Sequence, residues 1–233
     1  IVARTENIAR LSFDLTPLFT TGAPIQLELD GIKLTNVAWS VWAKPATGRP
    51  AKSEVATPLA LARASEGWAV AGPANPAQKN PRRYGPLREA FTGRMLFVYA
   101  TQGDAAENAW ALAKARYDAE SFWYRGNGSI DVVPDTAYVA HPERFTRPDG
   151  HRRSVILYGH AQANAAWAGL LGASPVQVRR GGVQIGERTL AGDQLAVLFL
   201  RPMPGDDLAL VGVVAGTGAV GARLAERLPV FLA

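Results

Sequence analysis

The fold is decided between Met95 and Gly126, where the chain reads MLFVYATQGDAAENAWALAKARYDAESFWYRG. The first five residues form a short unbroken apolar run, which is typical of a central parallel strand covered on both faces. Asp104 and Glu107 have the spacing of a capping box and therefore mark the start of a helix. Because a strand and a long helix form the first half of a right-handed crossover, we expect a second strand over residues 130–133.

The predicted helix is amphipathic and ends at Gly126, which we expect to be its left-handed C-cap. Small and apolar side chains recur at steps of three and four residues and predict the buried stripe, which consists of Ala105, Ala109, Leu112, Ala115, Ala119 and Phe122. Lys114 and Asp118 are spaced for an ion pair across one turn, which we place on the opposite side. Trp110 and Trp123 lie beside the stripe, and we expect both indoles to be largely buried.

Working outward from this stretch, the chain divides into three parts. Residues 1–72 show the two-residue alternation of strands and predict a small antiparallel β domain. Residues 73–86 contain four prolines and predict a linker. Over residues 87–233, apolar strands alternate with helical patterns. We therefore predict an α/β fold, a flavodoxin-like, mostly parallel sheet with helices on both faces, preceded by the antiparallel β layer.

Composition excludes several classes of function. The 233 residues contain no cysteine, so thiolate nucleophiles, disulfides and cysteine-based metal sites are excluded. The formal net charge is +5, but the arginines form pairs far apart in sequence, which indicates a scattered basic surface and no nucleic-acid partner. No window approaches eighteen consecutive apolar residues, so we expect no membrane span.

A candidate crevice is predicted at the carboxyl edge of the sheet, where open α/β folds bind ligands. Its members are Thr101, Gln102, Asp135, His160, Asn164, Gly216, Thr217 and Gly218. His160 can act as a general base only with an orienting carboxylate or a nucleophile, and Asp135 is its one plausible partner. We favour the simpler interpretation, in which His160 is a capping or surface residue.

A G-x-G-x-x-G motif at Gly216, Gly218 and Gly221 lies between a predicted strand and a predicted helix. Its amides could hold a phosphate at the helix N-terminus. A dinucleotide domain, however, needs a following strand with an acidic residue about twenty positions later, and the sequence stops at Ala233. We therefore favour a tight turn that lets the helix pack closely, and we expect no cofactor.

Catalytic and metal-binding motifs are missing from the sequence. No G-x-S-x-G occurs, and Ser129 precedes a predicted strand, so the usual nucleophile elbow is excluded. The histidine and acidic residues near positions 141–151 lack the spacing of metal ligands. We expect no catalytic residue and no metal site.

Six strings together resemble a known family: RRYGPLREAF, MLFVYATQG, ENAWALAKARYDAESFWYRGNGSIDV, SVILYGHAQANAAW, SPVQVRRGG and LALVGVVAGTG. They resemble the C-terminal region of bacterial prolyl oligopeptidase-family serine hydrolases, which are similar in architecture to secreted α/β-hydrolases. The resemblance extends from about Asn7 to the end. In that family the nucleophile and its partners would lie upstream, so no catalytic residue carries over to this chain. The resemblance implies a domain attached to a hydrolase and exported to the periplasm or secreted.

Two functional interpretations follow. In the first, which we favour, the chain is a non-catalytic accessory module that packs on the hydrolase domain of the same, longer protein or shapes access to its active site. In the alternative, the chain is a self-sufficient ligand-binding or hydrolytic domain that uses the crevice. A crevice with His160 and Asp135 within hydrogen-bonding distance would favour the alternative, whereas a flat, apolar exposed face would favour the module.

Overall fold

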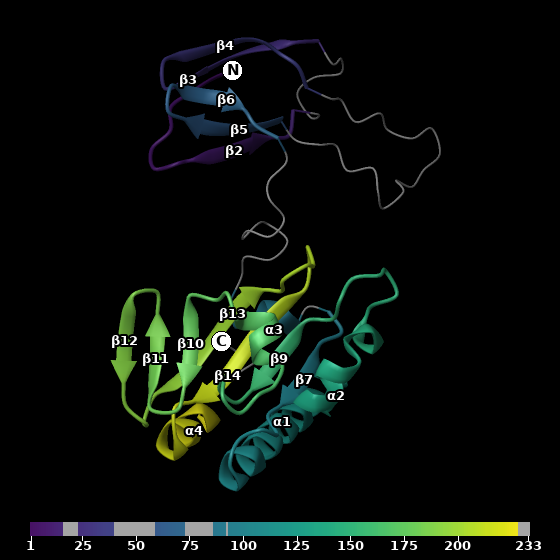
Figure 1. Ribbon diagram of the computed structural model, residues 1–233. Coiled ribbons are helices and arrows are strands. Elements are labelled where there is room, and N and C mark those ends of the chain that lie inside the picture. Colours follow the sequence, from purple (N-terminus) through teal and green to yellow (C-terminus); the bar gives the residue numbers. More distant parts are fainter. Residues whose placement is uncertain (16–22, 40–58, 73–85, 92, 228–233) are drawn as a thin grey trace. The chain divides into compact units, whose positions relative to one another are not determined.

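The structure is a computed structural model that describes residues 1–15, 23–39, 59–72, 86–91 and 93–227. The chain divides into two compact units, Ile1–Asn75 and Pro76–Ala233 (Figure 1). Most of the predicted linker, residues 73–85, lies outside the described residues. Among the helices that are described, none is long and apolar enough to cross a membrane.

The first unit contains two three-stranded sheets with a shared core. One sheet has the order β1 (Val2–Ala3), β3 (Ile25–Leu29), β4 (Ile32–Val37), and the other β2 (Arg10–Phe13), β5 (Leu59–Ala64), β6 (Gly67–Val70). All pairs are antiparallel except β1 with β3. The Asp30–Gly31 turn between β3 and β4 is left-handed at both residues, with φ of 52° and 82°. Side chains such as Leu27, Leu61 and Trp68 pack between the sheets.

The second unit is organised by a five-stranded sheet of order β13-β14-β9-β7-β8. The strands are β7 (Leu96–Tyr99), β8 (Asp131–Pro134), β9 (Val155–Tyr158), β13 (Ala196–Pro202) and β14 (Leu210–Gly216). The first three and β14 run parallel, and only β13 is antiparallel to its neighbour. The mostly parallel sheet expected from the buried apolar runs is confirmed.

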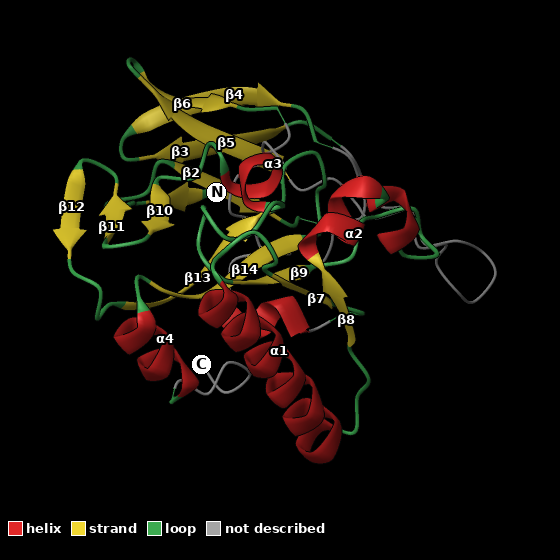
Figure 2. Cartoon of the chain, turned by 60° about the horizontal axis from the view of Figure 1, so that its bottom comes forward, coloured by secondary structure: helices red, strands yellow, loops and turns green. Residues whose placement is uncertain are grey.

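Helices cover both faces of this sheet (Figure 2). On one face, a cluster of core side chains that includes Phe97, Ile156 and Val214 packs against three helical elements. These are α1 (Ala105–Gly126), α4 (Ala219–Glu226) and the 3₁₀ turn η1 (Leu87–Phe91). The opposite face packs against α2 (Asp135–Ala140) and α3 (Trp167–Leu171), and η2 (Pro142–Phe145) follows α2. Strand side chains alternate between the two clusters, which is why each strand reads as an unbroken apolar run.

Between β9 and β13 the chain forms a separate three-stranded antiparallel sheet, β10 (Val176–Arg179), β11 (Gly182–Ile185) and β12 (Arg188–Ala191). None of these three strands pairs with a strand of the main sheet. Val178 and Val183 instead pack in the core on the face of α3. We call residues 176–191 the insert.

Helix α1 begins as predicted and ends differently. The Asp104 side chain accepts from the Glu107 amide at 2.9 Å, and the Glu107 carboxylate accepts from the Asp104 amide at 2.9 Å, so the capping box is confirmed. The left-handed C-cap is Asn127, with φ of 50°, and not Gly126. Asparagine tolerates this conformation, so the helix continues through the glycine.

The buried face of α1 differs from the predicted stripe. Ala105 and Ala109 are exposed, whereas Lys114 and Asp118 are buried beneath the helix. The Lys114 ammonium donates to Asp118 Oδ1 at 2.7 Å, and the hydroxyl of Tyr158, on β9, donates to Asp118 Oδ2 at 2.9 Å. The ion pair predicted for the other side of the helix therefore faces the sheet.

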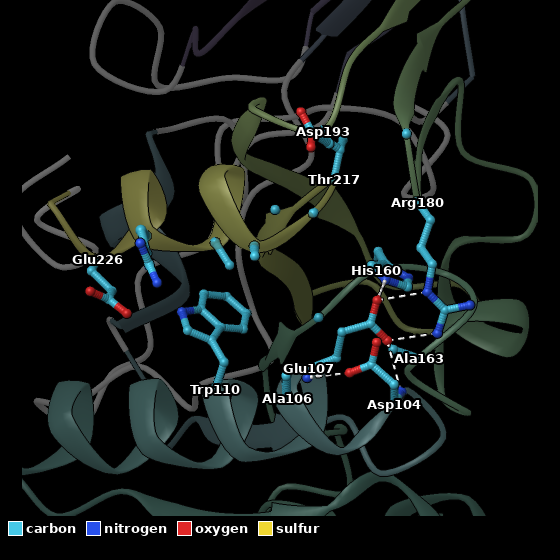
Figure 3. A pocket seen from close by; sticks show the side chains of 17 residues that line it. Asp104, Ala106, Glu107, Trp110, His160, Ala163, Arg180, Asp193, Thr217 and Glu226 are labelled. Carbon is cyan, nitrogen blue, oxygen red and sulfur yellow. Dashed lines mark hydrogen bonds and ion pairs between the residues drawn. The ribbon is translucent and has the colours of Figure 1, made fainter.

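The two tryptophans of α1 also depart from the prediction. Trp123 is 65% exposed, so its predicted burial is wrong, while Trp110 is only partly buried. Figure 3 shows the Trp110 ring standing between α1 and α4.

Candidate functional site

One part of the predicted crevice, at the ends of β7, β8 and β9, is held together by hydrogen bonds within the protein. The Thr101 hydroxyl donates to Asp135 Oδ1 at 2.5 Å, and the Ala165 amide donates to Asp135 Oδ2 at 2.6 Å. The Asn164 side-chain amide donates to the carbonyls of Val98 and Tyr158 at 3.1 and 3.3 Å. Asp135 and Asn164 are both buried, so these hydrogen bonds join the ends of neighbouring strands in the protein interior.

His160 does not pair with Asp135. Its Nε2 atom lies 2.9 Å from Glu107 Oε1, and its Nδ1 atom accepts the Gln162 amide at 3.2 Å. An Nδ1 that accepts carries no proton, so the ring is the tautomer that donates from Nε2 to the carboxylate. Both ring nitrogens of this buried histidine are therefore engaged.

Glu107 is the centre of a clamp that joins three separate segments. Arg180, in the turn between β10 and β11, donates to its two oxygens at 2.7 and 2.6 Å. We call Glu107, His160 and Arg180 the Glu107 clamp. The hydrogen bonds from Arg180, followed by those from His160 and the Asp104 amide, lower the pKa of Glu107 from 4.5 to about 2. The carboxylate therefore stays charged at any physiological pH and ties the insert to the first turn of α1.

A cavity of about 520 Å³ lies next to the clamp, between α1 and α4 (Figure 3). Helix α1 and its N-cap contribute Asp104, Ala106, Glu107 and Trp110, and helix α4 contributes Ala219, Ala222, Arg223 and Glu226. The remaining wall comes from the strand ends and loops, at Gly159, His160, Ala163, Arg180, Gly181, Asp193 and Gly216–Gly218. The hollow thus opens at the carboxyl ends of β9 and β14, which is one part of the predicted crevice.

The glycine motif is explained by close packing of α4. A Cβ at Gly216 would lie 2.2 Å from the Ala222 amide nitrogen, and one at Gly221 would lie 2.2 Å from the Leu195 carbonyl oxygen. The Gly221 amide also donates to the Asp193 carbonyl at 3.1 Å. The glycines therefore let the helix approach β14 and the loop before β13, as the packing interpretation predicts.

The predicted site residues divide into two groups. His160, Gly216, Thr217 and Gly218 line the cavity, whereas Thr101, Gln102, Asp135 and Asn164 do not. Sequence reasoning missed the contributions of Glu107, Trp110, Arg180 and Asp193. For Arg180 the signal was its place in a glycine turn, but its partner lies 73 residues away in the sequence.

The two cavity-lining side chains with the most reactive groups, Thr217 and His160, already make hydrogen bonds within the protein. The Thr217 hydroxyl donates to the Gly192 carbonyl at 2.7 Å and accepts from the Leu195 amide at 3.1 Å. With this hydroxyl and both nitrogens of His160 engaged, neither residue is prepared to act as a nucleophile or general base. An indole, several alanines and charged groups line the remaining surface.

Comparisons of the chain with protein-family models, with curated proteins and with solved structures find no match.

Proposed function

We propose that the unit Pro76–Ala233 binds a small molecule in the cavity between α1 and α4 and does not hydrolyse it. The observation that carries this proposal is the hollow of about 520 Å³ at the carboxyl edge of a mostly parallel sheet. Ligand pockets span roughly 300–1,000 Å³ and combine apolar walls with a few polar groups, and they occur at this edge in open α/β sheets.

The engaged state of His160 supports binding without hydrolysis. A histidine base needs a free nitrogen that can take a proton from a nucleophile or water. His160 instead donates to Glu107 and accepts from the Gln162 amide. Its role in this proposal is to hold Glu107 in place, and the clamp in turn fixes one end of the cavity.

A fragment screen with a pair of matched variants tests the proposal. Ala106 and Ala105 are adjacent exposed residues in the first turn of α1, and only Ala106 lines the cavity. We expect ligand-observed NMR to identify fragments that bind the wild-type chain saturably. Ala106→Trp should abolish that binding because the indole fills the hollow, whereas Ala105→Trp should preserve it. Equal loss or equal retention in the two variants would rule out the cavity as the site.

A second candidate function, docking to a hydrolase domain of the same longer protein, is favoured by the aromatic surface of α1. Tyr117, Trp123 and Tyr124 are 62, 65 and 82% exposed. Exposed tyrosine and tryptophan side chains are enriched in protein interfaces. In this proposal the chain is the C-terminal accessory module of a periplasmic or secreted serine hydrolase.

The flavodoxin-like character of the sheet also belongs to this proposal. The order β8-β7-β9-β14 of the four parallel strands supports it, because the chain first adds a strand on one side of β7 and then continues on the other. The antiparallel β13 at the far edge departs from an all-parallel arrangement.

Kinetics on the isolated chain and on the longer protein test the docking function. We expect the isolated chain to hydrolyse neither small acyl esters nor prolyl peptides. In the longer protein, the triple substitution Tyr117→Ser/Trp123→Ser/Tyr124→Ser should change the KM or the thermal stability of the hydrolase. The control substitution Glu120→Gln, at an exposed position on the same helix, should change neither. Hydrolysis by the isolated chain, or unchanged behaviour of the triple variant, would contradict this function.

A further inference from the structure

The cavity carries an excess of negative charge. Four carboxylates and two guanidinium groups line it, and Glu107 and Arg180 neutralise each other within the clamp. Three carboxylates, Asp104, Asp193 and Glu226, then remain against the single cation Arg223 among the described lining residues. Asp104 lies beside the clamp, Asp193 lies near the start of α4, and Glu226 lies at the far end (Figure 3). The negative charge therefore surrounds the hollow and is not confined to one side.

The start of α4 is already supplied with negative charge. A helix N-terminus attracts anions through its amides and dipole. Here the Asp193 carbonyl accepts the Gly221 amide, and the Asp193 Cβ lies only 2.8 Å from the position that a Cβ on Gly218 would take. Because Asp193 also lines the cavity, its negative charge disfavours phosphate and carboxylate ligands at this helix end.

Trp110 supplies an aromatic surface among these carboxylates. Its ring stands between α1 and α4 and lines the hollow, with Glu226 to one side and Glu107 to the other (Figure 3). The face of an indole attracts ammonium and guanidinium groups more strongly than any other side-chain ring. Ala106, Ala163 and Ala222 add small apolar surface against which a hydrocarbon body can pack.

We propose that the ligand of this cavity is a small organic cation, an amine or guanidinium on an apolar body, held over Trp110 and balanced by Asp193 and Glu226. This inference rests on the proposed binding function and adds the chemical class of the ligand.

Three probes of the same shape and different charge test it: benzylamine, benzyl alcohol and benzoate. Binding is followed by Trp fluorescence and by ligand-observed NMR. We expect benzylamine to bind saturably, benzyl alcohol to bind more weakly and benzoate not to bind over the same concentration range. Glu226→Gln should weaken benzylamine binding about two- to fivefold, the effect of a solvent-exposed charge pair, and leave benzyl alcohol unchanged. Glu120→Gln, an exposed carboxylate on α1 outside the cavity, serves as the matched control.

The outcomes separate this inference from the binding function itself. If benzyl alcohol or benzoate binds at least as tightly as benzylamine and Ala106→Trp abolishes that binding, the cavity is a ligand site and the cationic class is wrong. If Glu226→Gln weakens all three probes equally, charge recognition is also wrong. If benzylamine binds and Ala106→Trp has no effect, the amine binds elsewhere and the inference fails. Absence of benzylamine binding overturns it directly.

Discussion

Replacing Asp118 by alanine should destabilise the second unit more than any surface change on α1. The Asp118 carboxylate accepts from the Lys114 ammonium at 2.7 Å and from the Tyr158 hydroxyl at 2.9 Å. The side chains of Lys114 and Asp118 are each 3% exposed. Asp118→Ala leaves a buried ammonium and a buried hydroxyl without this partner. Breaking a buried pair in this way costs about 3–5 kcal/mol.

Removing all three polar groups together should cost far less. Burial raises the pKa of Asp118 above its usual value in spite of the hydrogen bond from Lys114, which indicates that the cost of desolvating the carboxylate exceeds the attraction of its partners. Replacement of a buried ion pair by apolar residues of similar volume is often neutral or stabilising. We therefore expect Lys114→Met/Asp118→Leu/Tyr158→Phe to unfold within about 1 kcal/mol of the wild type.

Urea unfolding followed by far-UV circular dichroism measures both variants, because every described α-helix lies in Pro76–Ala233. The expected signature is a large loss for the single substitution and its recovery in the triple variant. A loss below about 1 kcal/mol for Asp118→Ala would refute the reasoning, since it would mean that Lys114 reaches water without the aspartate. A triple variant as unstable as the single one would show that the polar groups stabilise the fold beyond compensating one another.

Three further measurements test the rest of the structure. Glu107→Gln should lower the free energy of unfolding by about 1–2 kcal/mol at neutral pH. Because the pKa of Glu107 is lowered from 4.5 to about 2, this difference in stability should be complete above pH 4.5 and should disappear as the pH falls through about 2. Urea titrations of both proteins across this pH range measure it. Gly216→Ala should lower the free energy of unfolding by roughly 3 kcal/mol because its Cβ would meet the backbone of α4, whereas Gly169→Ala in α3, with open space around it, should be neutral or stabilising. The melting temperature should therefore fall for Gly216→Ala and stay the same or rise for Gly169→Ala. Trp123→Ala should lower the free energy of unfolding by less than about 1 kcal/mol because the ring is mostly exposed. A loss near 3 kcal/mol would show that the ring is buried in solution.

Local chemistry accounts for the features that the sequence predicted well. The capping box of Asp104 and Glu107 satisfies amides within its own turn. The unbroken apolar strands reflect coverage on both faces. Each of these signals lies within a few consecutive residues and needs no knowledge of distant partners.

The buried face of α1 was mispredicted because the helix is rich in alanine and offers little contrast between its sides. Exposed and buried alanines look alike in the sequence, as Ala109 and Ala115 show. The burial of Lys114 and Asp118 depends on the hydroxyl of Tyr158, which lies 40 residues beyond Asp118. A spacing of four residues predicts an ion pair, but it carries no information about which side faces the sheet.

Half of the predicted crevice residues line the cavity, and the other half lie outside its lining. Their positions at strand ends placed His160 and Thr217 at the carboxyl edge of the sheet, and both line the cavity. Glu107 was interpreted only as a cap, yet the same carboxylate holds His160 and Arg180 from 53 and 73 residues away. One side chain with a local role and a long-range role is recognised from the sequence by the local role alone.

The insert lines one wall of the cavity but shares no strand pairing with the five-stranded sheet. Residues 176–191 form a sheet of their own, and none of their ladders is shared with the five strands. Their turn nevertheless contributes Arg180 and Gly181 to the lining. Changes of length or sequence in this turn can therefore reshape the mouth of the cavity while every ladder of the main sheet is retained. In evolutionary terms the arrangement is modular, because one short hairpin turn can be exchanged without altering the pairing of the five strands.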